Sequence, residues 1–260
     1  MNDQDDFPLV SIITVSYNSS KTIRDTLQSL AIQDYPNIEH IIVDGSSTDN
    51  TLDIIRSFPH VKQVYSENDN GIFDAMNKGI RYANGKIIGI LNSDDFYISE
   101  TVISKIVNQL KVKKADAVYA DLIYVHPIHV DKILRTWIAG PYDVKRFLNG
   151  WMPPHPTFFV RKEVYDKFGG FQSHLRFAAD YELMLRFLYK YKIKATYLPQ
   201  CIVKMRSGGH SNSSYKNRLK ANLEDRESWR MNDMKPRFYT TWLKPLRKLT
   251  QFIYENKSKA

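Results

Sequence analysis

The stretch Ile87-Ile88-Gly89-Ile90-Leu91-Asn92-Ser93-Asp94-Asp95 joins a short apolar run to a polar turn that ends in two acids. An apolar run of this length, bounded by turn residues, predicts a buried strand over 87–91. Two adjacent carboxylates at a strand end offer the hard oxygen ligands that Mg²⁺ and Mn²⁺ prefer, and these ions also bind substrate phosphates. The alternative is a solvated turn, because Asp and Ser are common in turns and at helix caps.

Strands and helices are expected to alternate on both sides of this stretch. The expected strands cover residues 9–15, 40–43, 63–65, 87–91 and 117–120, and helical patterns cover 23–31, 72–83, 100–110 and a segment around 52–55. This order predicts an α/β fold with a mostly parallel, Rossmann-like central sheet flanked by helices. Because ligands bind beyond the carboxyl ends of the strands in such sheets, one edge is expected to hold Asp44, Asp94, Asp95 and Asp121.

The second half of the chain has a less regular pattern. It predicts a short strand at 158–160, helices at 162–168, 181–191 and 215–229, and loops at 151–156 and 207–211. From about residue 231 the composition changes to a basic, aromatic tail.

The composition limits the classes of partner. The chain has 260 residues, a net charge of +9 and a pI of about 9.4. This charge suits nucleic acid, an anionic lipid or a phosphorylated substrate. The single cysteine, Cys201, excludes an internal disulfide framework. The N-terminus is acidic and no apolar run reaches the roughly 20 residues that span a bilayer, so a cytoplasmic protein is expected.

Four further polar residues are candidates for chemistry, and each has a plainer alternative. Asp44 could accept a hydrogen bond from a base or ribose, with Gly45 allowing close approach, or it could belong to an ordinary turn. Asp180 precedes an apolar helix that would stabilise its ionised form, or it only caps that helix. His155 and His210 lie in loops, where an imidazole binds a metal or a hydroxyl, or is merely solvated.

Three motifs of competing enzyme classes are absent from the sequence. No Gly-x-Gly-x-x-Gly follows the first expected strand, and there is no Walker-type Gly-Lys-Ser/Thr loop. A Gly-x-Ser-x-Gly elbow is missing as well. Dinucleotide redox chemistry, P-loop nucleotide hydrolysis and serine hydrolysis are therefore disfavoured.

In order along the chain, seven segments resemble the family-2, GT-A-type inverting glycosyltransferases of bacterial polysaccharide assembly. They are VSIITVSYN (10–18), HIIVDGSSTDNT (40–51), SENDNGIFDAMNKG (66–79), NSDD (92–95), HPTFF (155–159), FGGF (168–171) and ADYELMLR (179–186). The resemblance covers about residues 8–211, and several motifs in one order are far more specific than any single motif.

The resemblance implies a role for each matching residue. Asp180 would be the catalytic base, and His155 and Tyr181 would contact the acceptor. A Mn²⁺ or Mg²⁺ ion would be held by Asp95, Asp94 and His210. The nucleotide sugar would contact Thr14, Ser16, Tyr17, Asn18, Asp44, Ser46, Asp69, Lys78, Asn92, Ser93 and Asp94.

The sequence departs from the family pattern at two positions. Ala179 stands where the family often has an acid just before the base, so Asp180 is the only expected base locally. Ser93 stands where the metal motif often has a further acid, which makes Asp95 the principal expected ligand. The resemblance also implies a GT-A domain over 1–215, with a nucleotide-binding half (about 1–122) and an acceptor half (about 123–215), followed by a helical extension over 216–260.

The implied reaction is the inverting transfer of a hexose from a UDP-sugar, with UDP-glucose or UDP-galactose as the expected donor. The acceptor would be a sugar on undecaprenyl diphosphate, and the β-linked product would enter an O-antigen, capsule or exopolysaccharide repeat unit. The alternatives are a non-catalytic homologue in an assembly complex, a nucleotidyltransferase and a basic nucleic-acid-binding protein. No nucleic acid is expected, because the strand-end carboxylates would repel its phosphates without a metal.

The basic tail predicts a contact of its own. Residues 235–260 carry seven Lys or Arg residues against one acid, Glu255, with aromatic residues interleaved. Leu246, Leu249 and Ile253 fall on one helical face. This pattern suits peripheral contact with an anionic membrane at its cytoplasmic side, and the alternative is a helix packed on the domain with a solvated basic face.

Overall fold

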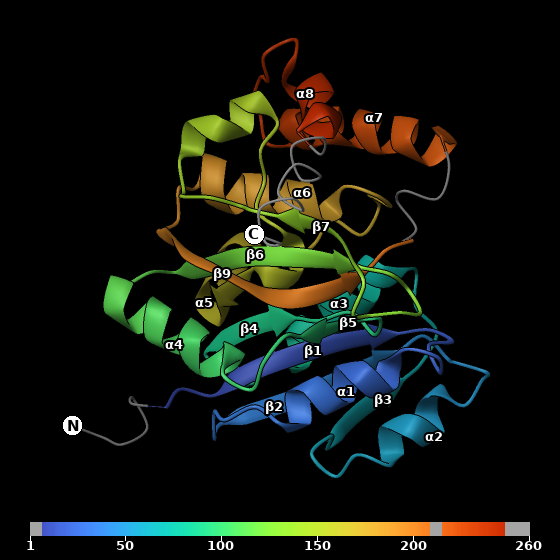
Figure 1. Ribbon diagram of the computed structural model, residues 1–260. Coiled ribbons are helices and arrows are strands. Elements are labelled where there is room, and N and C mark those ends of the chain that lie inside the picture. Colours follow the sequence, from blue (N-terminus) through green and yellow to red (C-terminus); the bar gives the residue numbers. More distant parts are fainter. Residues whose placement is uncertain (1–6, 209–214, 248–260) are drawn as a thin grey trace.

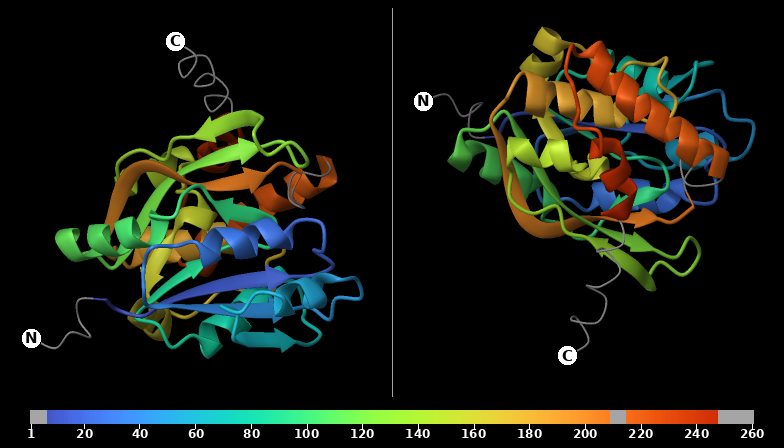
Figure 2. Two further views of the ribbon diagram at one scale, coloured as in Figure 1. Left: turned by 60° about the horizontal axis from the view of Figure 1, so that its bottom comes forward. Right: turned by 90° about the horizontal axis from the view of Figure 1, so that it is seen from above.

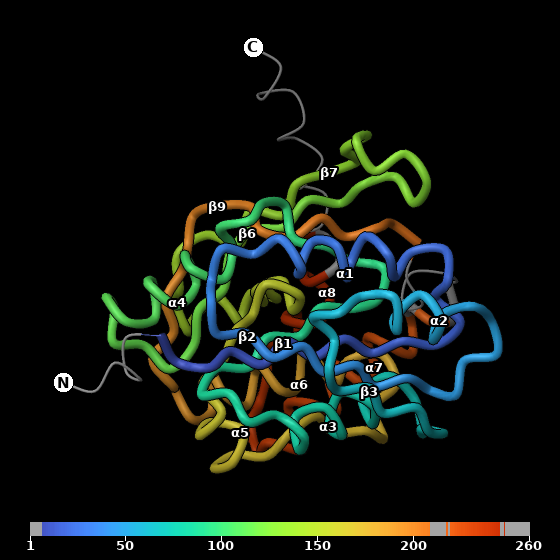
Figure 3. Tube along the Cα trace, turned by 90° about the horizontal axis from the view of Figure 1, so that it is seen from below, coloured from blue at the N-terminus to red at the C-terminus, as the bar shows by residue number. Residues whose placement is uncertain are grey.

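The computed structural model describes residues 7–208 and 215–247, which build one mixed sheet flanked by helices (Figure 1). The strands are β1 (Val10–Ser16), β2 (Ile38–Asp44), β3 (Gln63–Ser66), β4 (Ile87–Ile90), β5 (Asp95–Tyr97), β6 (Ala117–Val125), β7 (Ile133–Trp137), β8 (Phe159–Arg161) and β9 (Ala195–Arg206). They follow the order β3-β2-β1-β4-β8-β6-β9-β5, and β7 pairs with β6. The hairpin of β6 and β7 projects from the body of the molecule (Figure 3).

The first half of the sheet is parallel. β1 pairs in parallel with β2 and β4, and β2 with β3. β8 is antiparallel to β4 and β6, whereas β6 and β9 are again parallel. The carboxyl ends of β1, β2, β3 and β4 therefore lie along one edge. The predicted α/β, GT-A-type architecture with a mostly parallel sheet is confirmed.

Helices cover both faces of the sheet. They are α1 (Ile23–Ala31), α2 (Thr51–Arg56), α3 (Ile72–Tyr82), α4 (Val102–Lys113), α5 (Lys162–Phe168), α6 (Ala179–Met184), α7 (Tyr215–Met231) and α8 (Thr240–Leu246). Short 3₁₀ turns η2 (Val144–Asn149) and η3 (His155–Thr157) and the π-helical segment η4 (Leu185–Lys190) complete the fold. The right-hand view of Figure 2 shows α7 and α8 lying over α6.

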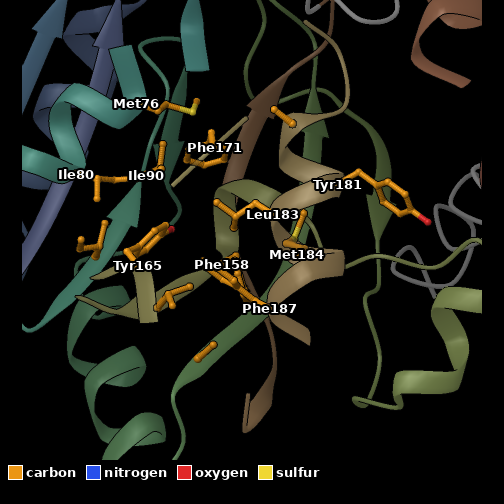
Figure 4. Packing of buried hydrophobic residues seen from close by; sticks show 14 of the residues in the cluster. Met76, Ile80, Ile90, Phe158, Tyr165, Phe171, Tyr181, Leu183, Met184 and Phe187 are labelled. Carbon is orange, nitrogen blue, oxygen red and sulfur yellow. The ribbon is translucent and has the colours of Figure 1, made fainter. Parts of the chain in front are cut away.

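The core divides between the two faces of the sheet because side chains alternate along each strand. On β1, Ile13 and Val15 join the cluster under α3, α5 and α6, whereas Val10 and Ile12 join the cluster under α4. Figure 4 shows the first cluster, in which Leu183, Met184 and other side chains of α6 and η4 meet those of α3 and β4. The helix α6, which carries Asp180, is thereby fixed to the same sheet that carries the acidic turn.

Four strands differ from the expectation. β5, β7 and β9 are additional strands, and β6 continues to Val125, five residues beyond the predicted end. Asp121 was expected at a strand end, and this prediction is wrong because the residue lies within β6. There its carboxylate accepts hydrogen bonds from Tyr197 Oη at 2.8 Å and from the Ala139 N–H at 2.7 Å. The sequence concealed β9 because Pro199 and Gln200 interrupt its apolar pattern, and the β6–β9 register shifts beside Asp121.

The expected helix over 181–191 begins earlier and changes type. It starts as α6 at Ala179 and continues as the π-helical η4 from Leu185 to Lys190. Within the described residues, no helix is long and apolar enough to cross a membrane. The tail beyond Arg247 and the loop with His210 lie outside the described residues.

Candidate active site

Asp44 ties together the ends of three neighbouring strands. Its side chain is fully buried at the end of β2. It accepts hydrogen bonds from Ser16 Oγ at the end of β1 (2.9 Å) and from Ser66 Oγ at the end of β3 (2.8 Å). The Ser47 N–H and Oγ donate at 2.8 and 2.5 Å. Four donors occupy the lone-pair sites of the carboxylate. Asp44 therefore fixes the turn after β2 at the carboxyl edge of the sheet.

Gly45 separates an exposed ring from a carboxylate beside that turn. A Cβ added at Gly45 would lie 2.7 Å from Asp69 Oδ2 and 3.5 Å from the Tyr17 ring. Asp69 Oδ1 accepts from the Gly71 N–H at 2.9 Å, which orients the side chain. The Tyr17 side chain is 66% exposed. A flat aromatic face and an acceptor thus flank backbone that a planar ligand can approach closely.

Two residues with left-handed backbone face each other in these loops. Asn18 has φ +47° and Ser46 has φ +60°. Asn18 Oδ1 accepts from the Thr48 N–H at 2.9 Å, and the Asn18 N–H donates to Ser47 Oγ at 2.9 Å. This backbone conformation is uncommon for residues with a side chain. The cross-loop hydrogen bonds hold it in place.

Lys78 on α3 fixes the loop that carries Asp69. Its ammonium pairs with Glu67 at 2.9 Å and donates to the Asn68 carbonyl at 2.9 Å. The hydrogen bond to Glu67 raises the pKa of Lys78. Its charge is thus already engaged by acidic partners, and the residue orders the loop over 67–69.

The acidic turn holds a carboxylate oxygen without a protein donor. Asp95 begins β5 and is fully buried, and its Oδ2 accepts from Asn92 Nδ2 at 3.2 Å. Asp95 Oδ1 and Asn92 Oδ1 are buried and make no hydrogen bond. Burial raises the pKa of Asp95 well above its usual range, and the neighbouring Asp94 charge adds to that shift. Burial also raises the pKa of Asp94.

These residues fit a divalent cation. Buried charges without partners are costly, and nearly all buried polar atoms in proteins find a partner. A hard cation beside Asp94 and Asp95 would satisfy the orphaned oxygen and offset the burial and the Asp94 charge that raise the pKa of Asp95. Among residues 7–208 and 215–247, however, no three His, Cys, Asp or Glu side chains gather into a metal site. The described residues offer two carboxylates here, so any further ligand would come from outside these ranges or from another molecule.

Arg206 braces the acidic turn from the end of β9. Its guanidinium donates to the Asp94 carbonyl at 2.7 Å, to the Pro127 carbonyl at 3.2 Å and to the Asp25 carboxylate. The side chain is 6% exposed. Its positive charge lowers the pKa of both acids and so opposes part of the burial effect.

Tyr124 links the acidic turn electrostatically to Asp180. Burial raises the pKa of this β6 side chain, and the charges of Asp95 and Asp180 raise it further. The Arg135 guanidinium on β7 lies 3.6 Å from the centre of the Tyr124 ring and acts in the opposite direction. The carboxylates of Asp95 on β5 and Asp180 on α6, which are far apart in the sequence, therefore both raise the pKa of Tyr124.

Asp180 itself lies in the first turn of α6 and is partly exposed. One of its oxygens accepts from the Tyr181 N–H at 2.7 Å. His155 in η3 belongs to the same neighbourhood: burial lowers the pKa of the imidazole, and the Asp180 charge opposes that shift. The His155 ring packs edge-on against Phe171, with ring centres 5.4 Å apart. A neutral imidazole and a carboxylate therefore share this end of α6.

Three residues expected at the site have other contacts. Thr14 is fully buried within β1, with its hydroxyl 2.9 Å from His40 Nε2. Tyr181 is 1% exposed and its hydroxyl accepts from Trp229 Nε1 at 2.9 Å, so it lies in the core, pointing away from the other labelled side chains of Figure 4. Ser93 lies 2.8 Å from Ser19 Oγ, between two loops. Thr14 and Tyr181 therefore lie within the core of the structure, and their expected contacts with donor and acceptor stay predictions.

A family model with the description glycosyl transferase family 2 matches residues 11–177. The chain belongs to this family. The match includes the Asp44 turn, the Asp69 loop and the acidic turn, and it ends three residues before Asp180.

This family 2 glycosyltransferase has bacterial relatives of similar sequence. An uncharacterized glycosyltransferase of Mycobacterium tuberculosis is 32% identical over 182 residues, which cover 69% of this chain and 68% of the relative. The teichuronic acid biosynthesis glycosyltransferase TuaG of Bacillus subtilis, a putative assignment, is 42% identical over 92 residues, covering 34% and 36% of the two chains.

Solved structures share the fold of this glycosyltransferase. A crystal structure of S. aureus TarS 1–349 with UDP-GlcNAc has a TM-score of 0.66 at 20% identity and covers 86% of this chain and 65% of that chain. The mannosyltransferase PcManGT from Pyrobaculum calidifontis, in complex with GDP-Man and Mn²⁺, has a TM-score of 0.66 at 19% identity, with coverages of 92% and 72%. At these identities the likeness establishes the fold.

Two residues of the candidate site were missed by reasoning from sequence. Arg206 ends a strand that the sequence pattern did not reveal, and Tyr124 lies in the unpredicted extension of β6. The sequence holds a signal for Arg206, because an arginine directly before the loop sequence Ser207-Gly208-Gly209 indicates a charged residue at the end of an element. For Tyr124 no local signal existed, since its role follows from the sheet order.

Proposed function

We propose that this glycosyltransferase moves a hexose from UDP-glucose or UDP-galactose to a sugar carried on undecaprenyl diphosphate, with inversion to a β-linkage. One observation carries the proposal: Asp95 keeps a buried oxygen without a hydrogen bond beside Asp94. The charges of Asp95 and Asp180 also both raise the pKa of Tyr124. The complex of TarS with UDP-GlcNAc supports a UDP-sugar donor.

The donor would bind at the edge formed by the ends of β1 to β4, in the nucleotide-binding half over 1–122. The exposed Tyr17 ring would stack on uracil, with Gly45 allowing close approach and Asp69 Oδ2 accepting from the nucleoside. Asp44 would act by holding the turn, together with Ser16 and Ser66. Asn18, Ser46, Lys78, Asn92 and Ser93 would order the surrounding loops.

Asp95, with Asp94, would hold Mn²⁺ or Mg²⁺, and donor phosphate oxygens would complete the coordination that two carboxylates leave open. When bound, such an ion neutralises charge on a nucleoside diphosphate leaving group. The PcManGT complex with Mn²⁺ supports a divalent metal. Arg206 would keep the Asp94 backbone in place from β9.

Asp180 would accept the proton of the acceptor hydroxyl as that oxygen attacks the anomeric carbon. Such general-base help typically contributes about 10²–10⁴-fold to the rate. Its hydrogen bond from the Tyr181 N–H fixes one oxygen and so orients the other. The neutral His155 beside it would contact the acceptor sugar, in the half over 123–215. A single displacement on an α-linked donor gives a β-glycoside.

The product would enter a bacterial surface polysaccharide, such as O-antigen, capsule or exopolysaccharide. The name of TuaG supports a polysaccharide pathway. A contact with the cytoplasmic face of an anionic membrane is part of the proposal, because α8 and the segment before it expose Phe238 (88%) and Trp242 (59%). Arg226 lies 5.7 Å from the Trp242 ring, so cations and aromatics share this surface.

The transferase proposal is tested with a panel of UDP-sugars and a synthetic GlcNAc- or GalNAc-diphosphate-lipid, with and without Mn²⁺, and product detection by mass. We expect a product one hexose heavier and UDP as the coproduct. Asp180→Asn keeps the acceptor of the Tyr181 N–H, so we expect near-normal donor binding and transfer at least about 10²-fold slower. Asp166→Asn is the control, because Asp166 is exposed and pairs only locally, with Lys162 on the same helix. Near-normal turnover of Asp180→Asn, or release of pyrophosphate, would contradict the proposal.

The membrane proposal is tested by sedimentation with vesicles that contain phosphatidylglycerol. We expect the double variant Phe238→Ser, Trp242→Ser to bind less than the native chain, because two exposed apolar anchors are lost. The control Val112→Ser removes an exposed apolar side chain from α4. Equal binding by all three proteins rules out this surface.

A further inference from the structure

Glu224 on α7 binds three consecutive backbone N–H groups in the segment that precedes α6. Its Oε2 accepts from Phe177 at 2.7 Å and from Ala178 at 3.0 Å. Its Oε1 accepts from Arg176 at 3.2 Å. A single carboxylate, almost 50 residues away in the sequence, thus gathers the chain just before Asp180.

These N–H groups need an acceptor that the local sequence does not supply. Residues 176–178 precede α6, so their N–H groups are not part of its ladder of hydrogen bonds and need another acceptor. Ala178 precedes α6 and has no polar side chain, and it makes no cap hydrogen bond. Its own carbonyl accepts from the Glu182 N–H at 2.9 Å and so starts the helix. Glu224 on α7 therefore supplies the acceptor for the three N–H groups that lead into α6.

Further hydrogen bonds join α6 to α7 and the residue that follows it, so the position of Glu224 relative to α6 is fixed. Trp229 donates to the Tyr181 hydroxyl at 2.9 Å, and Asn232 donates to Glu182 Oε1 at 2.9 Å. Trp229 and Glu182 are almost completely buried. Trp229 follows Glu224 on α7 by slightly more than one helical turn, and Asn232 lies directly after the end of α7. Figure 2 shows α7 lying over α6 as this pairing requires.

We propose that Glu224 is a positioning residue for Asp180: it fixes where α6 begins and hence the direction of the Asp180 carboxylate. The inference rests on the proposed function of Asp180 as the base. Residues 176–178 lead directly into the turn that carries Asp180, so releasing their three N–H groups lets this turn shift. A misplacement of about 1 Å at a reacting group costs roughly 10²-fold in rate.

The test compares Glu224→Ala, Glu224→Gln and Glu224→Asp in the full chain, with kcat, KM for the UDP-sugar, and thermal melting as readouts. We expect Glu224→Ala to lower kcat by about 10–100-fold with KM for the donor changed by less than about 2-fold. Glu224→Gln keeps one carbonyl oxygen for Phe177 and Ala178, so we expect it to recover kcat to within about 5-fold. Glu227→Ala is the matched control on the same helix, because the Glu227 side chain pairs with Arg230.

Full kcat in a folded Glu224→Ala variant overturns the proposal. If Glu224→Ala does not fold, Glu224→Asp decides, since it keeps the charge and withdraws the carboxylate by one methylene. Lowered kcat with an unchanged donor KM then supports the positioning role, and full kcat overturns it. The variant Asp180→Asn distinguishes a failure of the proposed function from a failure of the positioning role of Glu224. Normal turnover of that variant refutes the proposed function itself, whereas a slow Asp180→Asn with normal Glu224 variants refutes the positioning role alone.

Discussion

Two turns at the same edge of the sheet each bury an aspartate completely, and they treat it in opposite ways. The turn after β2 surrounds Asp44 with four donors, from Ser16, Ser47 and Ser66. The turn after β4 gives Asp95 one donor, Asn92, and leaves Oδ1 without a partner. Both side chains have 0% exposure. Burial alone therefore does not distinguish them, whereas the number of donors does.

The difference separates a structural carboxylate from one kept for a ligand. A buried carboxylate with all its lone pairs filled is stable as an anion without help from solvent. A buried carboxylate with an empty lone pair costs free energy in the free protein, and that cost is recovered when a cation binds. The Asp44 turn should therefore matter most for folding, and the Asp95 turn for activity and metal response.

The largest expected effect comes from Asp95→Asn. Removing the principal carboxylate from the proposed metal site would take away several kcal/mol of transition-state stabilisation. We expect transfer to slow by about 10²–10³-fold, and excess Mn²⁺ should not restore it. Initial rates over a Mn²⁺ titration measure this. Asp53→Asn, which removes an exposed acid paired with Arg56 on α2, is the control. Recovery of the native rate at high Mn²⁺ would move the metal site away from Asp95.

Asp44→Asn should act on stability instead. An amide presents one acceptor oxygen and two N–H groups, so at least one of the four donors loses its acceptor and meets another donor. We expect the free energy of unfolding to fall by about 2–4 kcal/mol, since hydrogen bonds to a charged group are involved. The loss should be the same with and without Mn²⁺. Urea unfolding in both conditions checks this, and a loss that appears only with the metal would erase the contrast between the two turns.

The sequence predicted the layout of the first half well, because that half is built from local patterns. The alternation of apolar strands and amphipathic helices up to residue 110 is confirmed, as is the α/β class. The polar residues at the ends of these strands meet simply because parallel strands share one edge. Local periodicity and one topological rule are enough for Asp44 and Asp95.

The second half depends on long-range pairing, and here the sequence was a weaker guide. β9 contains Pro199, and its pairing with β6 shifts register twice, so neither strand shows a clean alternation. Arg206 and Tyr124 gain their place from that pairing. Glu224 lies in a helix that reads as polar throughout, and its partners are the backbone of a distant loop. No local spacing predicts such a contact.

A smaller effect is expected when Asp95→Asn is studied without metal. Burial raises the folded-state pKa of Asp95, so its stability contribution is highest at low pH and is lost as pH rises through that pKa. At pH 8 the metal-free variant should therefore be more stable than the native chain, by about 1–3 kcal/mol. This corresponds to a melting temperature higher by about 2–8 °C.

The pH dependence provides the control for this stabilisation. The advantage of Asp95→Asn should shrink as pH falls toward the usual range of a carboxyl group, because native Asp95 then holds its proton in both states. Melting curves in EDTA between pH 5 and pH 8 measure it. A metal-free variant that melts below the native chain at pH 8 would mean that the folded protein stabilises the anion of Asp95.

Gly45→Ala should give the smallest change in free energy. It tests whether the turn after β2 contacts the donor. The added Cβ would lie 2.7 Å from Asp69 Oδ2, so the Asp69 side chain must move. Gly45 has no left-handed backbone that would itself oppose alanine. We expect the dissociation constant for the UDP-sugar to rise by about 3–10-fold, or about 1 kcal/mol, with little change in melting temperature. Titration calorimetry measures it, and the exposed Thr48→Ala is the control. Unchanged donor affinity would show that Asp69 does not contact the nucleoside, and the turn that Asp44 holds would then serve folding alone.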